Sequence, residues 1–154
     1  MLAAALILTA ADLALKTLAE HQLTSTPGPR LLGLIELRLT YNTGMAFSLG
    51  AALPHGIIVA GTGLLTAAVA AYTWRTAPTT PLAGRIGQAG VLGGALANLI
   101  DRGRDGKVTD YLHTGWWPTF NLADAVIVCG AALLVLTTVR QPAPTPDKDP
   151  ARWT

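Results

Sequence analysis

The chain has 154 residues, of which 51% are apolar and only 13% are charged, and its formal net charge is +2. Soluble domains carry about 25% charged residues, so this balance argues against an ordinary soluble domain and against disorder over most of the length. The eleven lysines and arginines are scattered and form no basic patch of the kind that binds nucleic acid, so we expect no nucleic acid partner. Membrane lipids are the better partner for such a chain.

Four stretches approach the roughly 20 apolar residues that a helix needs to cross a bilayer. They run over residues 2–19, 54–74, 82–100 and 122–139. The second is the cleanest, because it opens with Pro54 at a helix-start position and stays free of charge through Trp74. The third is the weakest, because Arg85 must reach an interface with its flexible side chain if this segment spans. The sequence therefore predicts a mainly α, polytopic membrane protein with four transmembrane helices in one membrane domain, residues 1–140.

An even number of crossings places both chain termini on one side of the membrane and the loops 20–53 and 101–121 on the other. Lysine and arginine counts should identify the cytoplasmic side, but five of these residues accompany each side. The distribution of lysines and arginines therefore does not determine which side of the membrane is cytoplasmic. Within the first loop, residues 35–41 alternate apolar and polar side chains, which predicts a half-buried strand. Residues 141–154 contain four prolines and are predicted to form a disordered tail.

Polar and ionisable residues within or beside these spans are costly in a membrane, so each is a functional candidate. Four crossings alone bring most of them to one membrane face, whichever way the chain is oriented. The set comprises Asp12, Asn42, Asn98, Asp101, Arg102, Asp110, Asn121 and Asp124. We therefore expect a polar site at that face.

Two groups in this set have structural as well as chemical interpretations. Asp12 and Lys16 are four residues apart with the acid first, the favourable order for a helical ion pair, and their expected role is support of the bundle. Asn98, Asp101 and Arg102 could simply cap the C-terminal end of the third span. The alternative, which the sequence leaves open, is that they converge with the other acids of the site.

Asp110 and Asp124 are the two candidate catalytic residues. Asn121 and Asp124 match an N-cap followed by an acid three positions later, and the helix dipole there should favour the ionised form of Asp124. Asp110 is placed in a loop with no cation next to it in sequence, so it could stay protonated. One charged and one neutral carboxyl held close can deprotonate a water and protonate a carbonyl oxygen, as in aspartyl proteases. Fourteen residues separate the two acids, so spacing alone does not establish the dyad.

The remaining candidates are weaker. Cys129 is the single cysteine, which excludes a disulfide within the chain, and its apolar neighbours in the fourth span favour a small buried residue. His21, His55 and His113 are too scattered to predict a metal site.

Five short motifs, in order along the chain, resemble those of a known family. They are Asp12 with Lys16; Asn42, Gly44, Ala46 and Phe47; Gly93, Gly94, Ala95, Asn98, Asp101 and Arg102; Val108, Asp110 and Tyr111; and Phe120, Asn121, Ala123 and Asp124. With them the chain up to about Val139 resembles lipoprotein signal peptidase, or signal peptidase II, the bacterial aspartic protease of the inner membrane. One departure is Ala97, where glycine is expected.

The resemblance implies a four-helix membrane protein with an extracytoplasmic β-rich cradle, both termini in the cytoplasm and the active site at the extracytoplasmic face. The implied reaction removes signal peptides from diacylglyceryl-modified prolipoproteins just before the lipidated cysteine, with no metal or organic cofactor, and globomycin-like peptides would inhibit it. By position, Asp110 and Asp124 match the catalytic pair. Residues that match the substrate pocket are Asn42, Gly44, Asn98, Asp101, Arg102, Asn121 and Ala123, and Asp12 with Lys16 match the supporting first-span motif.

The sequence leaves two other functions open. A small transporter or proton-conducting bundle could use Asp12, Lys16 and Asp124 as a relay. A relay should place acids at several depths, whereas the acids here gather at one face and residues 54–74 carry no charge. The other alternative is a scaffold that only binds lipidated partners.

Overall fold

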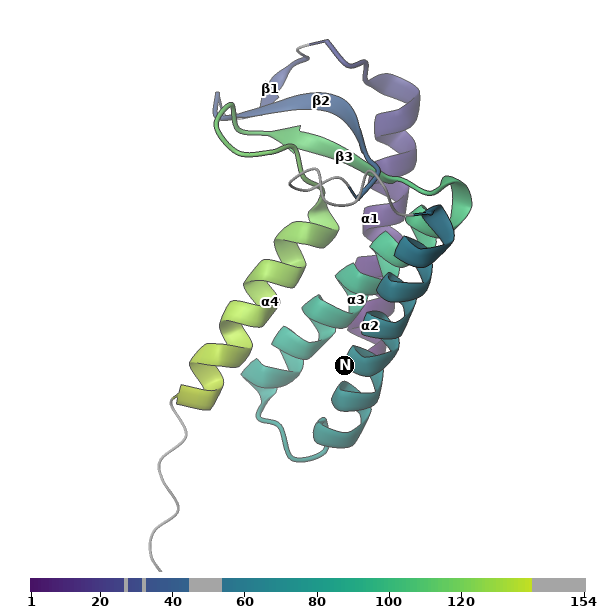
Figure 1. Ribbon diagram of the computed structural model, residues 1–154. Helices are drawn as coiled ribbons and strands as arrows, with labels where there is room; N and C mark the ends of the chain where they lie inside the picture. Colours follow the sequence, from purple (N-terminus) through teal and green to yellow (C-terminus); the bar gives the residue numbers. More distant parts are fainter. Residues whose placement is uncertain (27, 32, 45–53, 140–154) are drawn as a thin grey trace, which may run out of the picture.

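The computed structural model of the chain describes residues 1–26, 28–31, 33–44 and 54–139, which form a bundle of helices with a small sheet at one end (Figure 1). In chain order the elements are α1 (Leu2–Gln22), β1 (Arg30–Leu31), β2 (Ile35–Asn42), α2 (His55–Thr76), α3 (Leu82–Asp105), β3 (Val108–His113) and α4 (Leu122–Val139). The predicted tail, 141–154, and the motif residues Ala46 and Phe47 lie outside the described residues.

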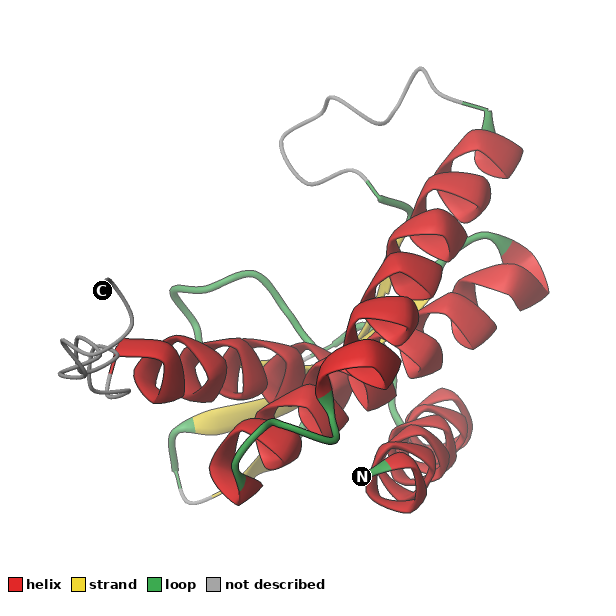
Figure 2. Cartoon of the chain, turned by 90° about the horizontal axis from the view of Figure 1, so that it is seen from below, coloured by secondary structure: helices red, strands yellow, loops and turns green. Residues whose placement is uncertain are grey.

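α3 occupies the middle of the bundle. It packs against α1, α2 and α4, whereas α1 and α4 touch one another little. The sheet, in the order β1-β2-β3 with antiparallel pairing, covers one end of the helices. The start of α1 and the end of α4 lie at the opposite end, and the view from below shows these two helices well separated there (Figure 2).

The membrane character of the fold follows from the helices. Among the described helices, α1, α2 and α4 are long and apolar enough to cross a membrane by length and composition. α3 does not meet that measure, in line with the weaker pattern of its sequence. It nevertheless runs from the far end of α2 back to the sheet, where α4 begins, and so traverses the same depth (Figure 1). The predicted mainly α, polytopic membrane fold with a small β cradle is confirmed.

Small residues explain why α3 can be surrounded while carrying fewer large apolar side chains. A Cβ at Gly130 of α4 would lie 2.6 Å from the backbone oxygen of Gly87 on α3, and one at Gly93 of α3 would lie 2.7 Å from the backbone oxygen of Ala5 on α1. Such close backbone approach is how membrane helices pack without a hydrophobic driving force between them. Ala97, where glycine was expected, is fully buried in α3, so its methyl group is accommodated.

The predicted strand is present as β2, but its alternation does not hold along its whole length. Glu36, on the polar face of the pattern, is 8% exposed, whereas Tyr41, on the apolar face, is 43% exposed. The pairing of β2 with β3 shifts register between Leu37 and Thr40. Such an irregularity changes the local twist and which face a side chain occupies. Glu36 is covered by Arg38, whose guanidinium lies 2.7 Å from its carboxylate.

The glycine contact between α3 and α4 yields a first prediction. Gly130→Ala should force the two helices apart and lower the free energy of unfolding by about 1–3 kcal/mol, seen as a lower melting temperature in detergent micelles. Gly61→Ala in α2 is the matched control, because no atom lies within 4 Å of a Cβ placed there, and it should be neutral or gain up to about 1 kcal/mol. Equal melting temperatures for wild type and Gly130→Ala would contradict the packing argument.

Candidate active site

The polar residues predicted to share one membrane face meet where the sheet joins the helices. Asp110 lies on β3, not in a loop as the sequence suggested, and it stands opposite Thr40 of β2. Its side chain is buried, with 2% exposure. The strand was missed because Thr109 and Asp110 interrupt any apolar alternation, and because β3 forms only by pairing with a strand far earlier in the chain.

Lys16 is the centre of a buried charge cluster. Its ammonium lies 2.9 Å from Asp12 Oδ2 and 3.3 Å from Asp101 Oδ2, and it donates a hydrogen bond of 2.6 Å to Asn98 Oδ1. Lys16 and Asp12 are each 1% exposed. A buried ammonium is stable only with such partners. The predicted ion pair within α1 is therefore present, and it extends to α3.

Asn98 and Asp101 do not cap the end of α3, which is one of the two interpretations left open. The helix continues to Asp105 and ends at Gly106, whose φ of 87° is left-handed. Asp101 Oδ2 instead accepts a hydrogen bond of 2.8 Å from the backbone N–H of Thr109, next to Asp110 on β3. The acid thus holds the strand against the helix.

The Asn98 amide connects the charge cluster to Asp124. Its Oδ1 accepts from Lys16, and its Nδ2 donates to Asp124 Oδ1 at 2.8 Å. An amide has one acceptor end and one donor end. Because Lys16 engages the acceptor end, the donor end must face Asp124, so the lysine fixes the orientation of the group that holds this acid.

The first turn of α4 shows the capping arrangement predicted from its sequence. Asn121 Oδ1 accepts the backbone N–H of Asp124 at 2.9 Å, and the backbone N–H of Asn121 lies 3.4 Å from Asp124 Oδ2. This reciprocal pair is a capping box, which satisfies N–H groups that the helix itself cannot. It also fixes the backbone that carries Asp124.

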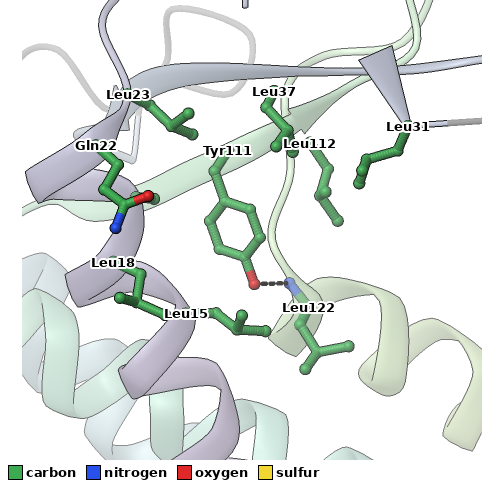
Figure 3. Close-up of a pocket in the computed structure, with 10 residues that line it drawn as sticks. Leu15, Leu18, Gln22, Leu23, Leu31, Leu37, Tyr111, Leu112 and Leu122 are labelled. Carbon is green, nitrogen blue, oxygen red and sulfur yellow. Dashed lines mark hydrogen bonds between the residues drawn. The ribbon is translucent and has the colours of Figure 1, made fainter. Parts of the chain in front are cut away.

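Two further N–H groups of that turn are satisfied by other elements. The backbone N–H of Leu122 donates to the Tyr111 hydroxyl of β3 at 3.1 Å (Figure 3), and the backbone N–H of Ala123 donates to Asp12 Oδ1 of α1 at 3.0 Å. The Tyr111 hydroxyl in turn lies 3.3 Å from Asp12 Oδ1. The helix that bears Asp124 is therefore fixed by α1, by β3 and by its own N-cap.

The electrostatics of Asp110 differ from those of an ordinary surface acid. Burial, and then the negative charge of Asp124, raise the pKa of Asp110 to about 7. The amides of Asn121 and Asn42 and the charge of Lys16 act in the opposite direction, and Asn121 Nδ2 donates a hydrogen bond of 2.6 Å to Asp110 Oδ1. Near neutral pH a substantial fraction of Asp110 therefore keeps its proton.

Arg102 brings a positive charge to the same place. It is half-buried on α3, and its guanidinium interacts electrostatically with Asp110, Asp124 and Asp101. Its Nη1 lies 3.5 Å from Thr62 Oγ1 of α2. The second helix thereby also contacts the group of residues around the two acids.

Asn42 and Gly44 close the sheet side of the site. Asn42 is the last residue of β2, and its Oδ1 accepts the backbone N–H of Gly44 at 2.9 Å. Gly44 has a φ of 85°, a left-handed conformation that glycine adopts at little cost. The turn thus lies at the end of β2, where Asn42 is paired with Val108 of β3.

Sequence reasoning missed two side chains that position these residues. Tyr111 appeared only as a motif residue, although a tyrosine on a buried strand needs a partner for its hydroxyl. The Thr109 hydroxyl is the second, since it donates to Glu20 Oε1 at 2.8 Å and links β3 to the end of α1. The signal for both was a polar group beside Asp110, but their partners are distant in sequence.

Comparison with known proteins now identifies the family. A family model described as Signal peptidase (SPase) II matches residues 4–140. The chain belongs to the signal peptidase II family. This match confirms the resemblance found in the five motifs. Membership of the family implies that the chain is a peptidase.

Individual relatives agree with the signal peptidase II assignment. A lipoprotein signal peptidase of Rhodococcus jostii is 36% identical over 140 residues, which cover 86% of this chain and 69% of that protein. One of Brucella ovis is 41% identical over 129 residues, covering 81% and 80%. A bacterial membrane enzyme structure obtained by the in meso method at 1.9 Å resolution shares the fold, with a TM-score of 0.77 at 18% identity, over 90% of this chain and 92% of that one. The family and the apolar helices together indicate a multi-pass membrane protein.

Removal of the buried Lys16 ammonium should lower the folding stability of this signal peptidase II family member. Lys16→Met leaves two buried carboxylates without their cation, so we expect the free energy of unfolding to fall by about 3–5 kcal/mol. The measurement is thermal or denaturant unfolding in micelles.

Lys107→Met is the matched control, because Lys107 pairs with Asp105 at 3.4 Å on the surface, where the two side chains are 34% and 51% exposed. Its loss should cost about 1 kcal/mol or less. Similar stability losses in the two variants would show that Lys16 has no special structural role.

Proposed function

We propose that the chain is an aspartic endopeptidase that removes signal peptides from diacylglyceryl-modified prolipoproteins, cleaving just before the lipidated cysteine. Membership of the signal peptidase II family, and relatives described as lipoprotein signal peptidases, support removal of signal peptides from lipoproteins. The observation that carries the aspartic chemistry is the pair of acids held by amide donors, Asp110 by Asn121 and Asp124 by Asn98.

In the proposed reaction the two acids divide the work. Asp110 holds a proton, since burial and the charge of Asp124 raise its pKa, and it hydrogen-bonds to the carbonyl oxygen of the scissile amide. Asp124, ionised, accepts a proton from a water whose oxygen attacks the amide carbon. Transfer of that proton to the leaving nitrogen then accompanies cleavage of the C–N bond. The amides of Asn98 and Asn121 keep both carboxyls in reacting positions.

The surroundings of Asp124 support a substrate that arrives through the lipid. Asp124 lines a groove of about 330 Å³ that is otherwise mostly apolar, with Trp116, Phe120 and Val128 among the other lining residues. Cys129, expected to be buried, is exposed and also lines this groove, because α4 packs on α3 through its other face. In the proposal the signal helix enters sideways while the lipid tails stay among acyl chains.

We place the protein in the bacterial cytoplasmic (inner) membrane, with the site at the extracytoplasmic face and both termini in the cytoplasm. The start of α1 and the end of α4 both lie at the end of the bundle away from the sheet, although well apart from one another, which supports termini on one side of the membrane (Figures 1 and 2). Globomycin-like peptides should compete with the prolipoprotein for the same site.

The two alternatives fit the residues less well. In a proton relay Asp12 and Lys16 would need exchangeable partners, whereas Asp12 accepts the Ala123 N–H and pairs with Lys16 in a fixed cluster. The acids among the described residues also gather toward the sheet end, whereas Arg75 and Arg85 lie at the α2–α3 turn at the other end. A scaffold that only binds lipidated proteins would not need two interacting acids, Asp110 and Asp124, of which Asp110 has its pKa raised to about 7.

The dyad is tested by isosteric replacement. Asp110→Asn and Asp124→Asn should each reduce cleavage by on the order of 10³-fold or more, since each removes one proton-transfer group. The measurement is the mass of the shortened product after incubation of purified protein with a diacylglyceryl-modified prolipoprotein. Asp105→Asn, at an exposed acid on the same side, is the control and should keep wild-type turnover. Near-normal turnover by either dyad variant would refute the mechanism.

The pH dependence follows from the sign of the Asp110 shift. An acid whose pKa is raised to about 7 loses its proton as pH rises through that value, so kcat/KM should fall on the alkaline side with an apparent pKa near 7. Asn121→Ser keeps an N-cap oxygen but removes the amide donor that stabilises ionised Asp110, so its alkaline limb should move to higher pH. A limb that stays in place or moves to lower pH would show that Asp110 is not the proton donor.

A further inference from the structure

A second cavity, apart from the two acids, lies beneath the sheet. Its volume is about 310 Å³, and it is an open recess bounded by the end of α1, the underside of the sheet and the start of α4 (Figure 3). Leucines contributed by all three regions line it: Leu15, Leu18, Leu31, Leu37, Leu112 and Leu122. Neither Asp110 nor Asp124 lines it, so the proposed reaction does not use this space.

The chemistry of the cavity wall points to an apolar ligand. Apart from Gln22 and Tyr111, every lining residue is leucine or alanine. The Tyr111 hydroxyl is already engaged, because it accepts from the Leu122 N–H (Figure 3) and lies 3.3 Å from Asp12 Oδ1. No charged side chain is among the lining residues. An ionic ligand would therefore lose its hydration without gaining a partner of opposite charge.

The position of the cavity identifies what can reach it. Leu15 and Leu18 belong to α1, one of the helices apolar enough to cross the membrane, and they are 40% and 53% exposed. In a multi-pass membrane protein such exposed leucines face lipid. Leu31, at the sheet side, is 47% exposed. The cavity thus opens onto the surface that faces lipid, near the C-terminal end of α1.

We propose that an acyl chain of a membrane phospholipid occupies this cavity as a bound lipid. A flexible hydrocarbon chain can follow a recess between a helix, a sheet and a second helix, and it supplies the dispersion contacts that the leucines otherwise lack. α1 and α4 touch little, so the lipid fills the space between them behind Tyr111. The proposal is independent of the peptidase mechanism.

The test is photo-labelling of the full chain in nanodiscs. The nanodiscs contain phosphatidylethanolamine and phosphatidylglycerol with a small fraction of phosphatidylglycerol that carries a diazirine in its acyl chain. After illumination, labelled peptides are identified by mass spectrometry, with no prolipoprotein present. We expect saturable labelling of the segments that carry Leu18 and Leu112, and one phospholipid retained per chain in native mass spectra after detergent extraction.

Two substitutions narrow the cavity from different elements. Leu18→Trp and Leu31→Trp should each reduce labelling at the cavity by about tenfold, because an added ring takes the space of the chain. Leu65→Trp is the matched control: Leu65 is 67% exposed on α2, does not line the cavity and should leave the labelling unchanged. Melting temperatures of all three variants verify that they remain folded.

Several outcomes would overturn the proposal. Labelling that does not saturate, or that persists in both narrowed variants, would indicate ordinary boundary lipid. Displacement of the label by a diacylglyceryl-modified prolipoprotein would make the occupant the substrate. Cross-links from a label at Leu18 to another copy of the chain would make it a dimer contact. Absence of retained phospholipid in the wild type would exclude a bound lipid even if the variants failed to fold.

Discussion

The structure depends on a lysine ammonium held away from water. Lys16 can remain buried only because Asp12, Asp101 and Asn98 surround it, and each of these partners has a second bond to another element. Asp101 reaches β3, Asn98 reaches Asp124, and Asp12 reaches the start of α4. One desolvated charge therefore links the positions of α1, α3, β3 and α4, since moving any of these elements would break bonds between buried polar groups.

The start of α4 shows how the N–H groups at a helix end can help to position a side chain of the site. A helix leaves its first N–H groups without internal partners, and here Tyr111, Asp12 and Asn121 accept three of them. The same contacts place Asp124 near Asp110, whose pKa rises because it is buried and beside another acid. In our proposal this fixed placement allows one carboxyl to act as the acid and the other as the base.

The membrane imposes a second constraint, which the site must satisfy together with the first. Small residues such as Gly87, Gly93 and Gly130 allow α3 to contact its neighbours backbone to backbone, so a helix that carries polar residues near the sheet end can be shielded from lipid. The sheet pairs the strands that follow α1 and α3 and closes the end of the bundle. Between sheet and helices this leaves an apolar recess on the α1 side, lined by leucines such as Leu37, and a groove beside Asp124 on α4.

The sequence by itself determined the long helices, the strand at 35–41 and the membrane face on which the polar residues gather, because hydrophobic length and local alternation are properties of neighbouring residues. It also identified the N-cap at Asn121, which depends on residues three positions apart. Only the tertiary structure placed Asp110 on a strand and gave Tyr111 its two partners. The contact between Asp12 and the Ala123 N–H joins positions 111 residues apart, and such contacts exist only once the helices and the sheet have packed together.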